Sequence, residues 1–382
     1  MRRPVVTLGV VACAVMLLAS SRATAQGTLG SQGFGYPPGQ LSVFARSVGG
    51  AMAETDPLSP INPAALALLR RGGLYLQTEQ ENRRLEADGL SGSTRTYRFP
   101  LFAAGIPIGS RGVIGMSFST LLDRTWGTVV SDKQVFGSDS ISYVERFRSQ
   151  GALNDVRVAG AYAIRDNLIV GLGLHLFPGE NRLTISRIYA DSLSFAALRD
   201  STNVNYFGGG VSAGLLWRAA RTLTVGASGR FGGTLKLRER DSLSSTADAP
   251  SRFGLGVRYE PITGTAIALR ADRELWSKMA GLGSERATPE DTWDTGIGID
   301  ALGPRLIGAQ LTLRVGARWR DLPFLASDEQ VRETAYSFGL GSPFASGRAQ
   351  LDFFGEHASR TAGDLDAKER SWTFGVGLTV KP

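Results

Sequence analysis

The chain has 382 residues, of which 42% are hydrophobic and 20% charged, with 42 Lys and Arg against 35 Asp and Glu and a single cysteine, Cys13. This composition excludes a helical membrane protein, which needs long uninterrupted apolar runs, and one cysteine excludes structural disulfides and zinc–thiolate sites. The arginines alternate along the chain instead of clustering, so the net charge of +7 does not indicate nucleic-acid binding.

Residues 1–25 are predicted to be a secretory signal peptide. Arg2 and Arg3 form the positive end, residues 5–18 form the apolar run, and Ala23-Thr24-Ala25 is a small-residue cleavage site. The run is shorter than the roughly 20 residues that a membrane-spanning helix needs. Cleavage would remove three arginines and no acid, which leaves 382 − 25 = 357 residues with a net charge of 7 − 3 = +4 and no cysteine.

Residues 26–71 are rich in Gly and Pro and lack sustained alternation, so we expect a separate N-terminal element, a hatch or plug. Within it, Asn62-Pro63-Ala64 begins a predicted short helix that ends at Gly72. Asn62 can cap the free amides of the first turn, and Pro63 at the first helical position loses no hydrogen bond. Gly72 provides the stop.

From residue 72 to residue 382 the pattern predicts an all-β, 14-stranded antiparallel transmembrane β-barrel. Apolar residues recur at every second position, as in Leu311, Leu313 and Val315, while Thr312, Arg314 and Arg318 occupy the other face. A strand with several arginines on one face cannot be buried on both sides, and alternation between a lipid face and a polar lumen is typical of outer-membrane barrels. The predicted strands span residues 72–86, 94–108, 112–131, 141–164, 168–188, 202–218, 222–239, 250–260, 264–276, 291–301, 306–320, 333–343, 348–359 and 369–380.

The connections between these segments alternate in length, with short turns such as residues 109–111 and 165–167 and longer polar loops such as residues 189–201 and 277–290. Short turns on one side and long loops on the other are typical of outer-membrane barrels, with the turns facing the periplasm. Segment 141–164 could be split by a turn at Gln150-Gly151. We keep it whole, since an even strand number closes both ends of the barrel on the periplasmic side, and Gly151 is then a bulge or strand kink.

The polar face of the strands predicts a lumen lined with both signs of charge, and an oily ligand would need an apolar patch built by the N-terminal element or the upper loops. The lumen-facing charged residues are predicted to include Arg157, Arg230, Arg258, Arg270, Arg314, Arg318, Asp272, Asp294 and Asp300.

No catalytic, metal or cofactor site is predicted. His175 and His357 are the only histidines, and neither has a neighbour at a metal-ligand spacing. Glycine clusters such as Gly208-Gly209-Gly210 lie within alternating strands, so we interpret them as small lumen-facing or closely packed positions and not as phosphate-binding loops. The chain is therefore not expected to be an enzyme.

The stretch Arg46-Ser47-Val48-Gly49-Gly50-Ala51, followed by Asp56 and by Asn62-Pro63-Ala64-Ala65-Leu66, resembles the N-terminal signature of the long-chain fatty-acid transporter family of outer-membrane barrels. The same superfamily contains the shuttle barrel of type IX secretion. The resemblance implies a 14-stranded barrel whose N-terminal segment folds into the lumen as a hatch that carries Asn62, Pro63 and Ala64. It also implies capture of a hydrophobic molecule from outside and its release sideways through a kinked strand.

Two functions follow as hypotheses for a chain expected in the outer membrane of a Gram-negative-type bacterium. The first is passage of small hydrophobic molecules such as long-chain fatty acids. The second is a non-transporting barrel that docks secreted or surface proteins. The expected partners are outer-membrane lipid, a hydrophobic ligand, and the barrel assembly machinery during biogenesis, and no nucleic acid. An apolar tunnel from the hatch to a gap in the wall, near the third strand or Gly151, would favour transport, whereas a lumen sealed by salt bridges would favour docking.

Overall fold

The computed structural model describes residues 33–382 except 88–89, 137–138, 191–193, 240–241, 283–288, 307–308, 327, 364–366 and 382. The predicted signal peptide and residues 26–32 of the predicted hatch lie outside the described residues. All strands belong to one antiparallel sheet, which closes on itself because the first strand pairs with the last from Leu74–Val380 to Ala87–Ala367.

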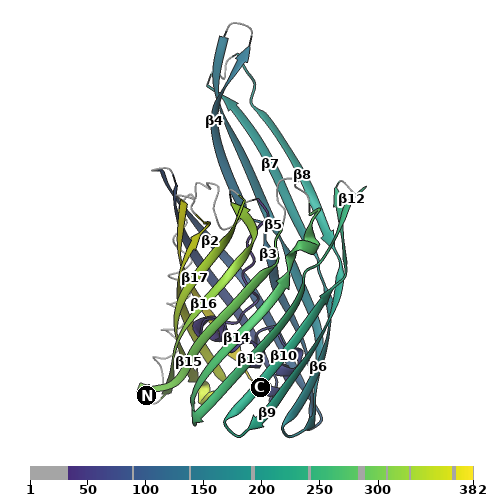
Figure 1. Cartoon of the computed structure of the whole chain (residues 1–382), viewed down its shortest axis with the longest axis vertical. Helices are drawn as coiled ribbons and strands as arrows, with labels where there is room; N and C mark the ends of the chain where they lie inside the picture. Colours follow the sequence, from purple (N-terminus) through teal and green to yellow (C-terminus); the bar gives the residue numbers. More distant parts are fainter. Residues whose placement is uncertain are drawn as a thin grey trace.

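The strands are β1 Gly73–Ala87, β2 Leu90–Ile108, β3 Gly112–Asp123, β4 Trp126–Phe136, β5 Asp139–Arg165, β6 Leu168–Leu176, β7 Gly179–Tyr189, β8 Leu198–Phe207, β9 Gly209–Ala220, β10 Leu223–Gly232, β11 Thr234–Glu239, β12 Ser242–Asp248, β13 Ser251–Ile262, β14 Thr265–Leu275, β15 Thr292–Leu306, β16 Ala309–Ala326, β17 Glu329–Phe344, β18 Ala349–Thr361 and β19 Ala367–Val380. Five transmembrane strands are each divided into two segments, namely β3/β4, β6/β7, β8/β9, β10/β11 and β12/β13. The barrel therefore has fourteen strands, and the predicted 14-stranded antiparallel barrel is confirmed (Figure 1).

Alternation along the strands separates an apolar outer face from a polar lumen. Leu172 and Leu174 are 70% and 68% exposed on the outside, whereas His175, one position further along β6, is only 4% exposed. The exposed apolar side chains are those that lipid would cover, because in a barrel only every second residue meets the bilayer. No helix in the described part of the chain is long and apolar enough to cross a membrane.

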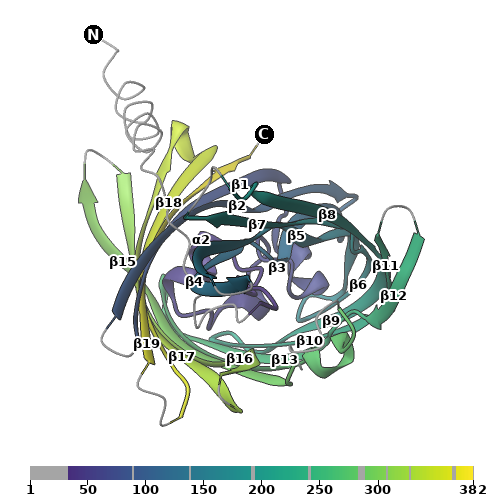
Figure 2. The same cartoon turned by 90° about the horizontal axis from the view of Figure 1, so that it is seen from above.

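Residues 33–72 lie inside the ring of strands, as the view along the barrel shows (Figure 2). This N-terminal segment contains three short helices, α2 Val43–Ser47, η1 Ala53–Thr55 and η2 Pro63–Leu68. The helix α2 contacts β17 and β18, η1 contacts β10 and β13, and η2 contacts β5, β6 and β9. The segment is therefore held by opposite sides of the wall at once.

Short turns, such as the one between β5 and β6, lie at one end of the barrel, and we place the periplasm at this end. At the other end β4, β5, β7 and β8 rise far above the rim as an antiparallel extension of the same sheet (Figure 1). Two further short helices, η3 Trp276–Met279 and η4 Ala345–Gly347, connect strands.

Candidate functional site

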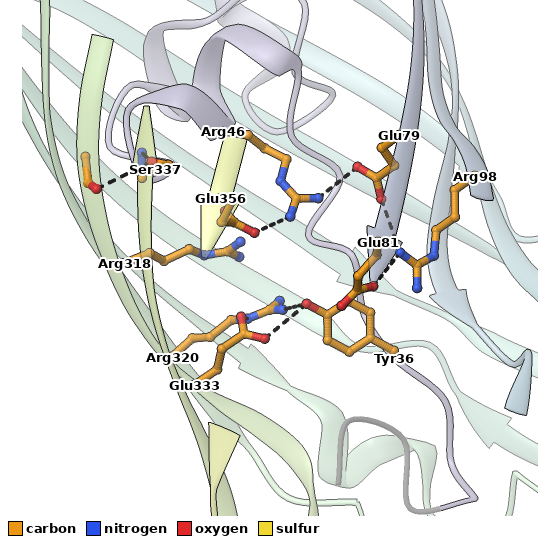
Figure 3. A network of polar contacts seen from close by, with 12 residues as sticks. Tyr36, Arg46, Glu79, Glu81, Arg98, Arg318, Arg320, Glu333, Ser337 and Glu356 are labelled. Carbon is orange, nitrogen blue, oxygen red and sulfur yellow. Dashed lines mark hydrogen bonds and ion pairs between the residues drawn. The ribbon is translucent and has the colours of Figure 1, made fainter. Parts of the chain in front are cut away.

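Buried ion pairs join the N-terminal segment to the barrel wall. Arg46 of α2 donates to Glu79 of β1 at 3.0 Å and also pairs with Glu356 of β18 (Figure 3). On the opposite side, Arg252 of β13 pairs with Glu54 of η1 at 3.0 Å. All of these side chains are at most 5% exposed. Because an unpaired buried charge is costly, each pair fixes the position of the segment against the wall.

Tyr36 is the centre of a second cluster near the outer end of the N-terminal segment. Its hydroxyl accepts a hydrogen bond from Arg320 and donates to Glu333 at 3.1 Å (Figure 3). It also accepts a hydrogen bond from Arg360. The guanidinium carbons of these two arginines also lie 5.0 and 4.7 Å from the centre of the Tyr36 ring, within cation–π range. One aromatic residue thus satisfies charges from β16, β17 and β18.

The nine charged residues predicted to face the lumen all come from strands, and eight of them have a partner in the structure. Arg230 pairs with Glu274 at 2.8 Å, Arg258 with Glu260 at 3.2 Å, Arg270 with Asp272 at 2.5 Å, Arg314 with Asp300 at 3.1 Å and Arg318 with Asp294 at 2.5 Å.

Arg157 on β5 is different. It is 3% exposed, yet it makes no hydrogen bond or ion pair with any residue that the structure describes, and its Nε and Nη1 atoms are buried without a partner. Ser117, which lies opposite Arg157 in the β3–β5 register, also has a buried hydroxyl without a partner. A buried guanidinium without a hydrogen bond is expected to destabilise the fold, because the attraction of nearby Asp155 offsets its desolvation only in part.

Sequence reasoning missed several polar residues that hold the N-terminal segment. Gln40 donates to Asp155 at 2.9 Å, and Asp155 also contacts Nδ1 of His175 at 2.7 Å. The other ring nitrogen of His175 lies 2.8 Å from the hydroxyl of Ser212. The residues 33–72 show no periodicity, so only the tertiary structure pairs Gln40 and Glu54 with the wall.

The triplet Asn62-Pro63-Ala64 forms the start of η2. The Asn62 side chain accepts from the Ala64 amide at 2.9 Å and donates to the carbonyl of Leu215 on β9 at 3.1 Å. Helix η2 ends at Leu68, before the predicted stop at Gly72. The wall has glycine where this turn approaches: a Cβ on Gly171 would lie 2.4 Å from the Ala64 nitrogen, and one on Gly214 would lie 1.9 Å from the Asn62 side-chain oxygen. Any larger residue there would displace the turn.

The barrel wall changes pairing at the third transmembrane strand. Strands β2 and β3 pair only as far as Leu101–Ser119, although β2 continues to Leu90 and pairs there with β1. Above that point Tyr36 takes the free edge of β3, since its amide donates to the Asp123 carbonyl at 2.7 Å and the Asp123 amide donates back at 2.8 Å. Arg98 of β2 reaches across to the Asp123 carboxylate at 2.6 Å. Here one residue of the N-terminal segment and one ion pair replace the backbone pairing between β2 and β3.

Strand β5 runs through Gly151 without a register shift against β7. A Cβ on Gly151 would lie 2.0 Å from the Glu180 carbonyl oxygen, so close approach of β7 explains the glycine. The neighbouring strands are the divided ones, at residues 124–125 between β3 and β4 and at residues 177–178 between β6 and β7.

An apolar cluster fills the lumen at the level where these strands divide. It joins Phe34 of the N-terminal segment to Leu121 and Leu122 at the end of β3, and the upper loops close it. Its other buried members are Tyr36, Leu153, Phe177, Tyr206, Leu235, Leu237, Ala249, Trp276, Met279, Leu282, Leu322, Phe324, Ala326, Val331, Ala362 and Ala367. This apolar cluster lies beside the altered pairing of β3.

Two cavities lie at different levels of the described barrel. One of about 30 Å³, room for a water molecule or two, lies between the N-terminal segment and the wall, with Gln40, Arg270 and Asp294 in its lining. A larger hollow of about 430 Å³ opens at the periplasmic end beside Leu68 and Arg218. Within the described residues no group of three His, Cys, Asp or Glu side chains could hold a metal ion.

The fold is that of known outer-membrane channels. The chain is similar to a FadL homologue from Pseudomonas aeruginosa (14% identity, TM-score 0.62, covering 91% of this chain and 99% of that one). It is also similar to the toluene transporter TodX from Pseudomonas putida (12%, TM-score 0.56, covering 92% and 100%) and to the monoaromatic hydrocarbon channel CymD (14%, TM-score 0.54, covering 88% and 96%). The resemblance to the fatty-acid transporter superfamily is thus confirmed at the level of the fold, and these structures are channels, not enzymes.

The barrel, with its apolar outer face, is an outer-membrane protein of a Gram-negative-type bacterium. A family model described as BamG matches residues 4–249, more than half of the chain. A search of curated proteins finds no match.

Proposed function

We propose that this chain, which belongs to the BamG family and folds as a barrel filled by its own N-terminal segment, passes small hydrophobic molecules across the outer membrane by a sideways route. Its likeness in fold to the toluene transporter TodX and the hydrocarbon channel CymD supports this proposal. Long-chain fatty acids are the substrate class that the N-terminal signature implies. In this proposal residues 33–71 act as the hatch. A hydrophobic molecule enters from outside, reaches the apolar cluster, and leaves through the wall between β2 and β3.

The observation that carries the proposal is the altered pairing at β3 beside the apolar cluster. The ion pairs below the cluster oppose axial passage of an apolar molecule. Such a molecule would have to separate the paired charges, and it has no polar group that could bond to them afterwards. Between β2 and β3, by contrast, the backbone pairing ends at Leu101–Ser119, and Tyr36 and the Arg98–Asp123 pair connect the wall above it. The sideways exit therefore lies where β2 and β3 lack backbone pairing, and opening it also separates Arg98 from Glu79 and Glu81 of β1.

Uptake of a fluorescent hydrophobic probe by cells with and without the gene tests the proposal. We expect faster uptake with the gene, and a further increase for Arg98→Gln, which removes the charge that bridges β2 and β3. Arg84→Gln is the matched control, since Arg84 is exposed on β1 and pairs with Glu86 outside the lumen. Equal uptake with and without the gene would contradict transport.

The second candidate is a docking barrel associated with the barrel assembly machinery or with secreted proteins. The buried ion pairs between the N-terminal segment and opposite walls favour it, and so does the family match, whose name relates to that machinery. Cross-linking in living cells followed by purification of the full-length barrel tests it. Recovery of assembly components or surface proteins in stoichiometric amounts would support docking, and a barrel that always isolates alone would remove its support.

A further inference from the structure

Six cations lie on four neighbouring strand segments above the membrane-facing part of the barrel. We call this set the outer basic face. Strands β5, β7, β8 and β11 pair with one another in that order, and all six side chains are exposed. The outer basic face consists of Arg146 and Arg148 on β5, Arg182 on β7, Arg199 on β8, and Lys236 and Arg238 on β11.

Alternation places these residues on the outer side of the wall. On β5, Asp155 and Arg157 are buried in the lumen whereas Val158 is 54% exposed, so even-numbered residues of β5 face outward. The β5–β7 register has no shift, which carries the outward face up to Arg146 and Arg148. On β11, Lys236 pairs with Phe207, which is 59% exposed. The outer basic face therefore begins at the level of Phe207, and it also carries exposed apolar residues, with Val129 opposite Arg146 and Leu243 opposite Arg238.

The charges of this face are not neutralised by the protein. Elsewhere exposed arginines have acidic partners, as in Arg84–Glu86 at 3.0 Å and Arg273–Asp291 at 3.4 Å. None of the six cations has an ion pair with a residue that the structure places. The same face carries only two placed acids, which are exposed: Glu180 on β7 and Asp248 on β12.

We propose that the outer basic face binds the phosphate groups of lipid headgroups in the outer leaflet. Guanidinium groups match phosphate oxygens with two parallel hydrogen bonds. The apolar band fixes the height of the barrel in the bilayer, so Lys236 and Arg238 meet the headgroup layer first and the arginines of β5, β7 and β8 meet phosphates carried further out. Lipid bound here would brace the protruding β4–β5–β7–β8 sheet on its outer side. This inference does not depend on the proposed transport.

Binding of a phosphorylated glycolipid to the purified full-length barrel tests the proposal. The barrel is kept in neutral detergent and titrated with a lipopolysaccharide that carries phosphate on both its lipid A and its core sugars, with the same glycolipid after removal of its phosphates, and with inorganic phosphate, and occupancy is read by native mass spectrometry. The test variant is R146Q/R148Q/R182Q/R199Q. The matched control, R84Q/R95Q/R273Q/R332Q, removes four exposed arginines from other strands.

Each cation near an anionic lipid surface contributes roughly a fivefold factor to binding, so we expect the test variant, which lacks four of them, to bind the phosphorylated glycolipid about 600-fold more weakly than the wild type. The matched control should change binding by less than about fivefold. Binding should weaken as salt rises, since exposed charges are screened. Equal wild-type affinity for the dephosphorylated glycolipid or for inorganic phosphate would overturn the proposal, as would full binding by the test variant, or binding of an acidic protein but no glycolipid.

The heat-modifiable gel mobility of each variant shows whether its barrel is folded. If the fourfold variant does not fold, R146Q/R148Q and R182Q/R199Q are tested separately, and each should lose about 25-fold in binding. Unchanged binding in both double variants would also overturn the proposal.

Discussion

Two buried arginines of the lumen provide a sharp comparison. Arg252 pairs with Glu54 at 3.0 Å and with Asp272 at 2.8 Å, whereas Arg157 has no partner within the described structure. Both are less than 5% exposed. Arg252→Met leaves the carboxylate of Glu54 buried, with one of its oxygens already lacking a hydrogen bond. Removing one member of a buried pair typically costs about 3–5 kcal/mol, and we expect this loss in the free energy of unfolding.

For Arg157→Met we do not expect a loss of unfolding free energy. It removes a desolvated charge, leaves no strong partner behind, and keeps a side chain of similar length, so the free energy of unfolding should be unchanged or rise by up to about 4 kcal/mol. Urea unfolding of the barrel in lipid vesicles, followed by tryptophan fluorescence, measures both variants under the same conditions. If Arg157→Met loses as much stability as Arg252→Met, Arg157 has a partner and the reasoning fails.

Three further perturbations test the packing of the N-terminal segment. Gly171→Ala places a Cβ 2.4 Å from the Ala64 nitrogen and should loosen the segment and raise single-channel conductance, whereas Gly160→Ala, whose nearest contact is at 4.0 Å, should not. Tyr36→Phe removes the hydroxyl shared by two buried arginines and Glu333 and should cost about 1.5–3 kcal/mol in unfolding free energy; an unchanged unfolding curve would show that water replaces it. Deletion of residues 33–71 should convert the barrel to an open pore with large conductance in planar bilayers, because fourteen strands enclose more space than the wall side chains fill, and a deletion variant that folds but does not conduct would contradict a plug role.

The sequence alone was sufficient for the architecture because a lipid-facing strand repeats every two residues. Polar neighbours such as Thr312 and Arg314 cannot face lipid, so the pattern along each strand shows which face lies outside. The same alternation placed Arg314 and Asp300 on the lumen side, where they pair at 3.1 Å. The alternation could not show that Arg157 lacks a hydrogen-bond partner, because the partners of lumen residues come from other strands and from the N-terminal segment, which lie far away in the chain.

Periodicity therefore determined the barrel, its fourteen strands and the sign of each face. Only the tertiary structure decided how the lumen is filled, because residues 33–72 have no repeat and their positions depend on contacts with opposite walls, as in Arg46 with Glu356 and Glu54 with Arg252. The altered pairing at β3 could not be predicted from the sequence either, because it arises where Tyr36 replaces β2 as the partner of Asp123. Local pattern fixes which way a side chain points, whereas long-range packing fixes what it meets.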